Sequence, residues 1–225
     1  MTSPATANAV RRSPLRVRHA ALGARWVSPL AEWPAQYSDA QREHDAVRTR
    51  AALCEWGPLD KLRLSAAASG ASVVPFALGR ISVGAIAGRR AELWGLAGDD
   101  ALLLVPAASG DAAAGLREVR AAADPTATDV SSHFCALRLV GPRSRDVLGE
   151  VYPEDVSDRA LPDRHVSFGP LANTPVILGR CDIGVTLGFT ILVERDLAEY
   201  MWDALLAIGA RHELTPAGVV ALADR

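Results

Sequence analysis

Short apolar runs typical of β-strands follow one another along this chain without a helix between each pair. The runs at 135–141, 175–180 and 189–194 have strand length, and the last two are joined by a connection through 184–188. A second pair, 91–96 and 101–105, flanks a turn at Gly98-Asp99-Asp100 and predicts a β-hairpin. Because strands and helices mix without strict βαβ alternation, the pattern favours an α+β fold over a doubly wound α/β fold.

Helical patterns are placed between and after these strands. Ser38 followed by Gln41 resembles a capping box and predicts a helix from about 39 to 52. The alanine-rich stretch 111–124 predicts a second helix, and Pro142 is expected at the first position of a third. The clearest helix spans 194–208, with Gly209 expected in a left-handed conformation after it. Its predicted apolar stripe consists of Leu197, Met201, Leu205 and Ile208.

Composition excludes several classes of partner. The 225 residues carry a net charge of −2, which provides no global field for nucleic acid or an acidic membrane, and a small-molecule substrate or a protein partner is favoured. No apolar run approaches the ~20 residues that span a bilayer. Three widely spaced cysteines, Cys54, Cys135 and Cys181, predict buried free thiols and a cytoplasmic protein.

The common catalytic and metal-binding motifs do not occur in the sequence, and the five histidines lack metal-ligand spacing. Residues 1–12 are expected to form a disordered tail. The arginines from 11 to 18, followed by Arg25 and Trp26, suit a solvated tail or a partner-docking arm. Trp33 and Tyr37 flank a proline-ordered turn, where aromatic side chains either wall a pocket for a flat heterocycle or pack in the core.

A set of collinear blocks resembles the folate-binding family that includes the aminomethyltransferase of the glycine cleavage system. The blocks, which together cover about residues 15–220, are Pro34-Ala35-Gln36-Tyr37, Glu43-His44-Asp45-Ala46-Val47-Arg48, Leu139-Val140-Gly141-Pro142, Gly188-Phe189, Met201-Trp202-Asp203-Ala204-Leu205 and Pro216-Ala217-Gly218. The resemblance implies one domain over 13–225, with mixed, mainly antiparallel sheets and flanking helices, and without the family's C-terminal barrel. The proline-rich region 152–175 is a candidate junction between two lobes of this domain.

The same resemblance suggests where function lies. It implies tetrahydrofolate as cofactor, Trp33 and Tyr37 as pterin walls, and Arg180 as the partner of an anionic group. The family's catalytic aspartate aligns with Arg90 and Ala91, which leaves Glu92 as the candidate catalytic acid. The carboxylate block that grips the pterin edge reads Val185 to Thr190 here, and a later Arg-Asp pair is replaced by Leu222-Ala223.

A second resemblance is to the gamma subunit of heterotetrameric sarcosine oxidase. Its pattern matches Arg11-Arg12-Ser13-Pro14-Leu15 and the segment from Asp129 to Arg143. Two functions therefore stay open. One is a tetrahydrofolate-linked transferase that takes a one-carbon unit from an N-methyl or aminomethyl substrate. The alternative is a non-catalytic subunit that docks on a larger demethylating oxidase or methyltransferase.

Overall fold

Two β-sheets packed face to face form the body of the protein. A computed structural model describes residues 12–27, 33–65, 77–108 and 112–222. The six-stranded sheet has the order β10 (His165–Leu171), β11 (Thr174–Arg180), β12 (Gly188–Glu194), β9 (Phe134–Val140), β3 (Ala51–Glu55), β13 (Leu214–Pro216). The five-stranded sheet has the order β5 (Ile81–Ile86), β6 (Arg89–Ala97), β7 (Asp100–Pro106), β4 (Leu59–Ser65), β8 (Thr128–Asp129). Among these pairs only β13–β3 is parallel, so the predicted α+β fold with mainly antiparallel sheets is confirmed.

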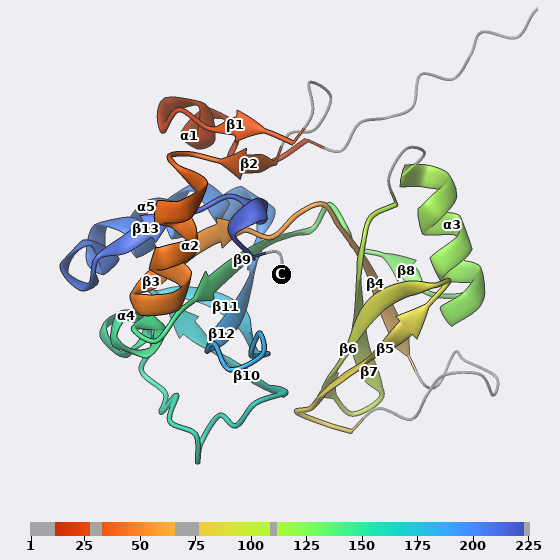
Figure 1. The fold of residues 1–225 in the computed structure, drawn as a ribbon. Helices are drawn as coiled ribbons and strands as arrows, with labels where there is room; N and C mark the ends of the chain where they lie inside the picture. The colour runs from red at the N-terminus through yellow and green to blue at the C-terminus, as the bar shows by residue number, and fades with distance from the viewer. Residues whose placement is uncertain (1–11, 28–32, 66–76, 109–111, 223–225) are drawn as a thin grey trace, which may run out of the picture.

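Helices cover the outer faces of the two sheets (Figure 1). Helix α3 (Ala112–Ala123) packs on the five-stranded sheet, and α4 (Ser144–Val151) and α5 (Ala198–Gly209) pack on the six-stranded sheet. Helix α2 (Ala40–Thr49) lies against the end of β3. A small N-terminal layer consists of α1 (Arg16–Ala21), β1 (Arg25–Trp26) and β2 (Pro34–Gln36). Single 3₁₀ turns occupy Arg195–Leu197, Ala210–His212 and Val219–Leu222.

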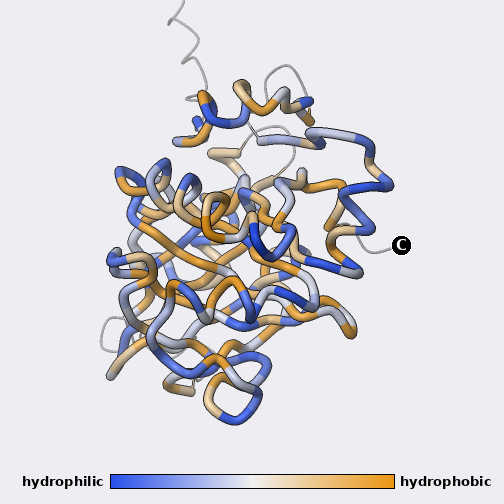
Figure 2. Tube along the Cα trace, turned by 90° about the vertical axis from the view of Figure 1, so that its left-hand side faces the viewer, coloured by the Kyte–Doolittle hydropathy of each residue, from blue (hydrophilic) through white to orange (hydrophobic). Residues whose placement is uncertain are grey.

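Alternation along the strands assigns each side chain to one of two layers. Neighbouring residues of a strand point to opposite faces, so Leu137 and Leu139 of β9 face α4 and α5, whereas Ala136 and Arg138 face the other sheet. The inter-sheet layer contains Trp94 of β6 and Leu192 of β12, both almost fully buried. The hydropathy trace shows hydrophobic stretches along the strands inside the molecule and hydrophilic ones in many peripheral loops (Figure 2).

Close approach of the two sheets depends on a glycine. A Cβ at position 179 would lie 2.3 Å from Cη2 of Trp94, so only glycine admits the indole at this point. The chain passes between the sheets at 56–58, after β3, and returns at 130–133, before β9. Segment 152–175 runs from the end of α4 through β10 into β11, beside the six-stranded sheet.

Several sequence predictions are confirmed. The hairpin appears as β6 and β7, with Gly98 at a φ of 58° in its turn. The alanine-rich helix is α3, and the runs at 135–141, 175–180 and 189–194 are β9, β11 and β12. The three cysteines are free and buried. No helix of the described ranges has the length and hydropathy that a membrane crossing requires.

Other local predictions were wrong. The cap of α2 is Asp39, whose carboxylate accepts from the backbone N–H of Gln41, so there is no Ser38–Gln41 capping box. That helix ends at Thr49, because Ala51 and Ala52 pair with β9 and β13. The helix after Pro142 begins two residues later, at Ser144.

The C-terminal helix also differs from its predicted pattern. Leu197 is 38% exposed, and Trp202 joins Met201 and Leu205 on the buried face. Gly209 is right-handed, and Glu213 takes the left-handed conformation instead. A Cβ at position 209 would lie 2.4 Å from Leu214, so this glycine serves close packing against β13.

Gly179→Ala is expected to destabilise the protein by about 2 kcal/mol, because the added methyl group forces the sheets apart at Trp94. Urea unfolding measures the change. Gly149→Ala in α4 is the control, since a Cβ there meets nothing within 4 Å and alanine favours a helix. Equal stability of Gly179→Ala and the wild type would contradict the packing argument.

Candidate functional site

A buried ion pair crosses the layer between the two sheets. Arg138 projects from β9 of the six-stranded sheet toward the five-stranded sheet. Glu92 projects from β6 of the five-stranded sheet toward Arg138. Their side chains are 4% and 3% exposed, and Nη1 of Arg138 lies 3.8 Å from Oε1 of Glu92. A charge can be buried at this depth only when it has a partner. The pair therefore ties the two sheets electrostatically.

Each member of the pair has further contacts. Nη2 of Arg138 donates to the carbonyl oxygen of Cys181 over 2.7 Å, and its guanidinium lies 4.3 Å from the centre of the Trp56 ring. Nε1 of Trp94 donates to Oε2 of Glu92 over 3.1 Å. Burial and the nearby Glu92 carboxylate raise the pKa of the Cys181 thiol to about 11. Cys181 therefore stays a neutral thiol. Trp94 and Arg138 hold the Glu92 carboxylate in place.

A hollow of about 170 Å³ adjoins the Arg138–Glu92 pair. Its lining residues are Trp56, Arg90, Glu92, Arg138, Asp182, Ile183, Gly184 and Leu222. Ligand pockets for molecules of drug size usually measure roughly 300–1,000 Å³. The hollow is thus small and is lined by side chains of both charges.

Segments that are far apart in sequence meet at this hollow. Arg90 and Glu92 come from the strand at which the family's catalytic aspartate aligns. Gly184 directly precedes the segment that replaces the pterin-gripping carboxylates, and Leu222 stands where an arginine is expected. The hollow therefore lies beside several of the positions at which the resemblance predicts a departure from the folate-binding pattern, although none of residues 185–190 lines it.

The structure places the remaining predicted site residues elsewhere. Trp33 is 9% exposed, and its indole lies against Gly57, where a Cβ would be 1.9 Å from Nε1 of Trp33. The hydroxyl of Tyr37 contacts Nδ1 of His19 over 2.6 Å, and its ring stacks on Trp202. Tyr37 therefore belongs to the outer face of the six-stranded sheet, whereas Glu92 faces the inner one. The roles of Trp33 and Tyr37 as pterin walls stay predictions.

Arg180 is occupied by groups of the protein. Its guanidinium donates to both carboxylate oxygens of Asp182, to Asp158 over 2.6 Å and to the carbonyl of Leu161 over 3.0 Å. The hydrogen bonds to Asp182 contribute most to the raised pKa of Arg180. A ligand anion would have to displace one of these carboxylates, so the anion-binding role of Arg180 also stays a prediction.

Sequence reasoning did not select Arg138, Trp56 or Asp182. Arg138 carried a usable signal, because it is a charged residue at an alternating position of an otherwise apolar strand. Trp56 and Asp182 follow the ends of β3 and β11 and have no such signature. Among the residues that the structure describes, no group of three His, Cys, Asp or Glu side chains is placed to hold a metal ion.

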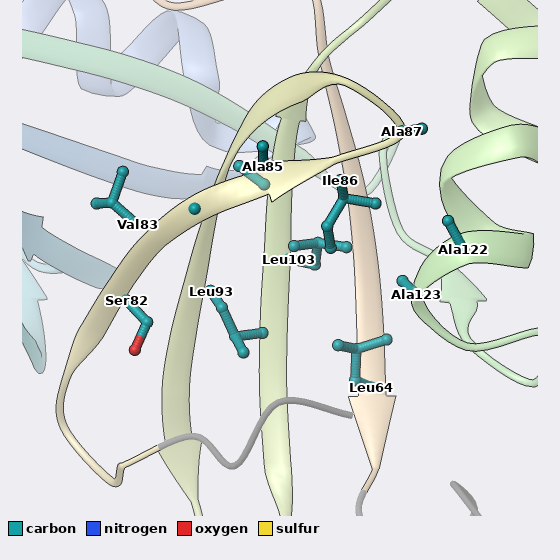
Figure 3. Close-up of a pocket in the computed structure, with 12 residues that line it drawn as sticks. Leu64, Ser82, Val83, Ala85, Ile86, Ala87, Leu93, Leu103, Ala122 and Ala123 are labelled. Carbon is teal, nitrogen blue, oxygen red and sulfur yellow. The ribbon is translucent and has the colours of Figure 1, made fainter. Parts of the chain in front are cut away.

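A second hollow has a different character. It measures about 390 Å³ and lies between the curled β5 strand, the sheet face beside it and α3 (Figure 3). Its lining side chains, such as Val83, Ile86, Leu93 and Leu103, are neutral, and no ionisable residue is among them. Acid–base chemistry requires a titratable group, so the smaller hollow beside Glu92 is the better candidate for a functional site.

This α+β chain matches the model of a known family. A family model described as the GCVT N-terminal domain matches residues 94–224. The match covers more than half of the 225 residues, and the chain belongs to this family.

Curated relatives are aminomethyltransferases. The protein of Deinococcus deserti is 29% identical over 236 residues, which cover 94% of this chain and 62% of that protein. The one of Cutibacterium acnes is 28% identical, with 93% of this chain and 62% of that protein covered. The chain thus spans about three fifths of the length of these relatives.

Two solved structures share the fold. A chain of the heterotetrameric sarcosine oxidase from Corynebacterium sp. U-96, in complex with pyrrole 2-carboxylate, superposes with a TM-score of 0.62 at 22% identity. The match covers 96% of this chain and 100% of that chain. The glycine cleavage system aminomethyltransferase T from Bartonella henselae gives a TM-score of 0.72 at 18% identity, with coverage of 95% and 61%.

Glu92→Gln is expected to destabilise the protein by about 3 kcal/mol, because the buried Arg138 guanidinium loses its counter-charge. Chemical denaturation measures the loss. The double variant Glu92→Gln/Arg138→Met is expected to be more stable than Glu92→Gln alone. Glu118→Gln, on the exposed side of α3, is the matched control. If Glu92→Gln leaves stability unchanged, the ion pair does not hold the sheets together.

The hydrogen bonds that Asp158 accepts are expected to make the stability of the protein depend on pH. Hydrogen bonds from Arg145 and Arg180 lower the pKa of its exposed carboxyl. A lowered folded-state pKa gives stabilisation that is present above the unfolded value of about 3.9 and is lost as the pH falls through the folded value.

The stability difference between wild type and Asp158→Asn should therefore shrink when urea unfolding is repeated at progressively lower pH. Asp196→Asn, at another exposed position, controls for general charge effects. A difference that persists below both pKa values would refute the assignment.

Proposed function

We propose that this chain acts as a non-catalytic, gamma-type subunit of a heteromeric N-demethylating oxidase. The observation that carries the proposal is the hollow between the sheets, which is lined by the buried Arg138–Glu92 pair and measures only about 170 Å³. The structural match extends over the whole of one chain of a heterotetrameric sarcosine oxidase, and this supports the same proposal.

The chemistry of Glu92 supports a structural role. A general acid or base must come within hydrogen-bonding reach of the substrate. Glu92 is 2% exposed; its Oε2 accepts from Trp94, and its Oε1 lies 3.8 Å from Nη1 of Arg138 without a hydrogen bond. Burial and the charge of Arg138 restrict the access of an incoming molecule to this carboxylate. The carboxylates that would pair with a pterin edge are replaced by neutral residues from Val185 to Thr190. A polar ligand edge that is buried without hydrogen-bond partners reduces the binding free energy by about 1–3 kcal/mol. This loss weighs against tight folate binding.

A second candidate function is tetrahydrofolate-linked one-carbon transfer. Membership of the GCVT N-terminal domain family favours it, as does the position of Glu92 on the wall of the cavity. In this case Glu92 would be the catalytic acid, and the ion pair with Arg138 would have to open when the ligand binds.

Isothermal titration of the purified chain with tetrahydrofolate separates the two candidates. We expect no heat of binding, and the Glu92→Gln variant should behave like the wild type. Saturable binding that Glu92→Gln weakens would establish the folate function instead. A melting curve before and after each titration checks that the chain is folded.

Purification of the tagged chain from its own organism tests assembly. We expect a larger oxidase chain to co-elute at constant ratio and the complex to oxidise N-methylglycine, while the chain alone has no such activity. A monodisperse chain without an oxidase partner would contradict the proposed subunit role.

A further inference from the structure

The charged hollow beside Arg138 and Glu92 contains hydrogen-bonding atoms that the protein itself leaves without partners. Oε1 of Glu92 and Nε of Arg138 are buried, and neither makes a hydrogen bond to another described residue. Nη1 of Arg138 is 3.8 Å from Oε1, which is longer than a hydrogen bond. Most buried polar atoms of native proteins have a partner, and each exception requires an explanation. A ligand that supplies one donor and one acceptor would explain both atoms.

Arg90 places a positive charge at the mouth of the same hollow. Neighbouring residues of a strand point to opposite faces, so Arg90 shares the inter-sheet face of β6 with Glu92 and Trp94. Trp94 is fully buried and Glu92 is 2% exposed, whereas Arg90 is exposed and lines the hollow. No hydrogen bond or ion pair joins the Arg90 guanidinium to another residue in the described part of the chain. Arg90 is therefore available to an anionic group.

The other polar walls of the hollow are less available. The Asp182 carboxylate accepts from the Arg180 guanidinium and from the backbone N–H of Gly188. The half-buried Trp56 ring has the Arg138 guanidinium 4.3 Å from its centre and provides a flat wall. The hollow thus offers an incoming molecule two kinds of polar group, which are arginine donors and the unpaired carboxylate oxygen of Glu92.

The volume of the hollow restricts the ligand to a small molecule. A space of about 170 Å³ corresponds to about six water-sized groups, since a water molecule takes up about 30 Å³ of the liquid. Arginine pairs with a carboxylate, and a carboxylate oxygen accepts from an ammonium N–H. A molecule of about six non-hydrogen atoms that carries both groups is a small amino acid.

We propose that this hollow binds a small α-amino acid in its zwitterionic form. The carboxylate of the ligand pairs with Arg90 at the mouth and accepts from Nε of Arg138, while its ammonium group donates to Oε1 of Glu92. Both protein atoms are buried, so binding requires a small rotation of the Arg138 and Glu92 side chains toward the hollow. The proposal goes beyond the subunit function and does not depend on it, because every contact is made by residues of this chain.

Ligand-observed NMR of the purified full chain with N-methylglycine tests this proposal, since that zwitterion has the required size and both charges. We expect saturable binding in the millimolar range. Acetate and methylammonium, which each carry one of the two charges, should bind more weakly. Arg90→Gln should raise the dissociation constant about tenfold, and Arg90→Lys should restore part of the loss because it keeps the charge.

Arg117→Gln is the matched control, because it removes an exposed arginine from α3, on the opposite side of the five-stranded sheet, and should bind like the wild type. Thermal melting checks that each variant is folded. The proposal is overturned if N-methylglycine gives no saturable signal at millimolar concentrations, if Arg90→Gln binds normally, or if acetate binds as tightly as N-methylglycine.

The outcomes also separate this proposal from the subunit function. A chain that co-elutes with an oxidase but does not bind N-methylglycine keeps the subunit role and loses the amino-acid site. A chain that binds N-methylglycine through Arg90 but has no oxidase partner keeps the site and loses the subunit role.

Discussion

Face-to-face packing of the two sheets is the constraint on which the rest of the molecule depends. It needs a glycine at 179 to admit Trp94, and it buries Arg138 and Glu92 where water cannot solvate them. A charge in such a layer is stabilised only by a partner and by hydrogen bonds from fixed groups. The carbonyl of Cys181 and the indole of Trp94 supply those bonds, so the polar centre and the packing of the sheets are one arrangement.

The same arrangement leaves a small charged hollow between the sheets. Two arginines and two carboxylates line it, and its volume is about 170 Å³. The residues from Val185 to Thr190 are neutral and offer no carboxylate, while Oε1 of Glu92 and Nε of Arg138 are buried without a hydrogen-bond partner among the described residues.

Local patterns along the chain were sufficient for much of the fold. Alternation in β9, the turn glycine of the β6–β7 hairpin and the alanine-rich sequence of α3 act within a few residues, so their elements could be predicted. Strands β5, β10 and β13 were not foreseen, because pairing partners distant in sequence stabilise them. The predicted stripe on α5 failed at Leu197, since burial there depends on which helix face meets the six-stranded sheet.

By itself, the sequence determined the α+β class and the main strands, since each is a matter of residue type and spacing. Only the tertiary structure decided which charged groups meet. Tyr37 and Glu92 lie on opposite faces of a sheet, and Arg138 reaches Glu92 across 46 residues of sequence. Electrostatic pairing depends on distance and burial in space, and neither quantity is encoded in linear spacing.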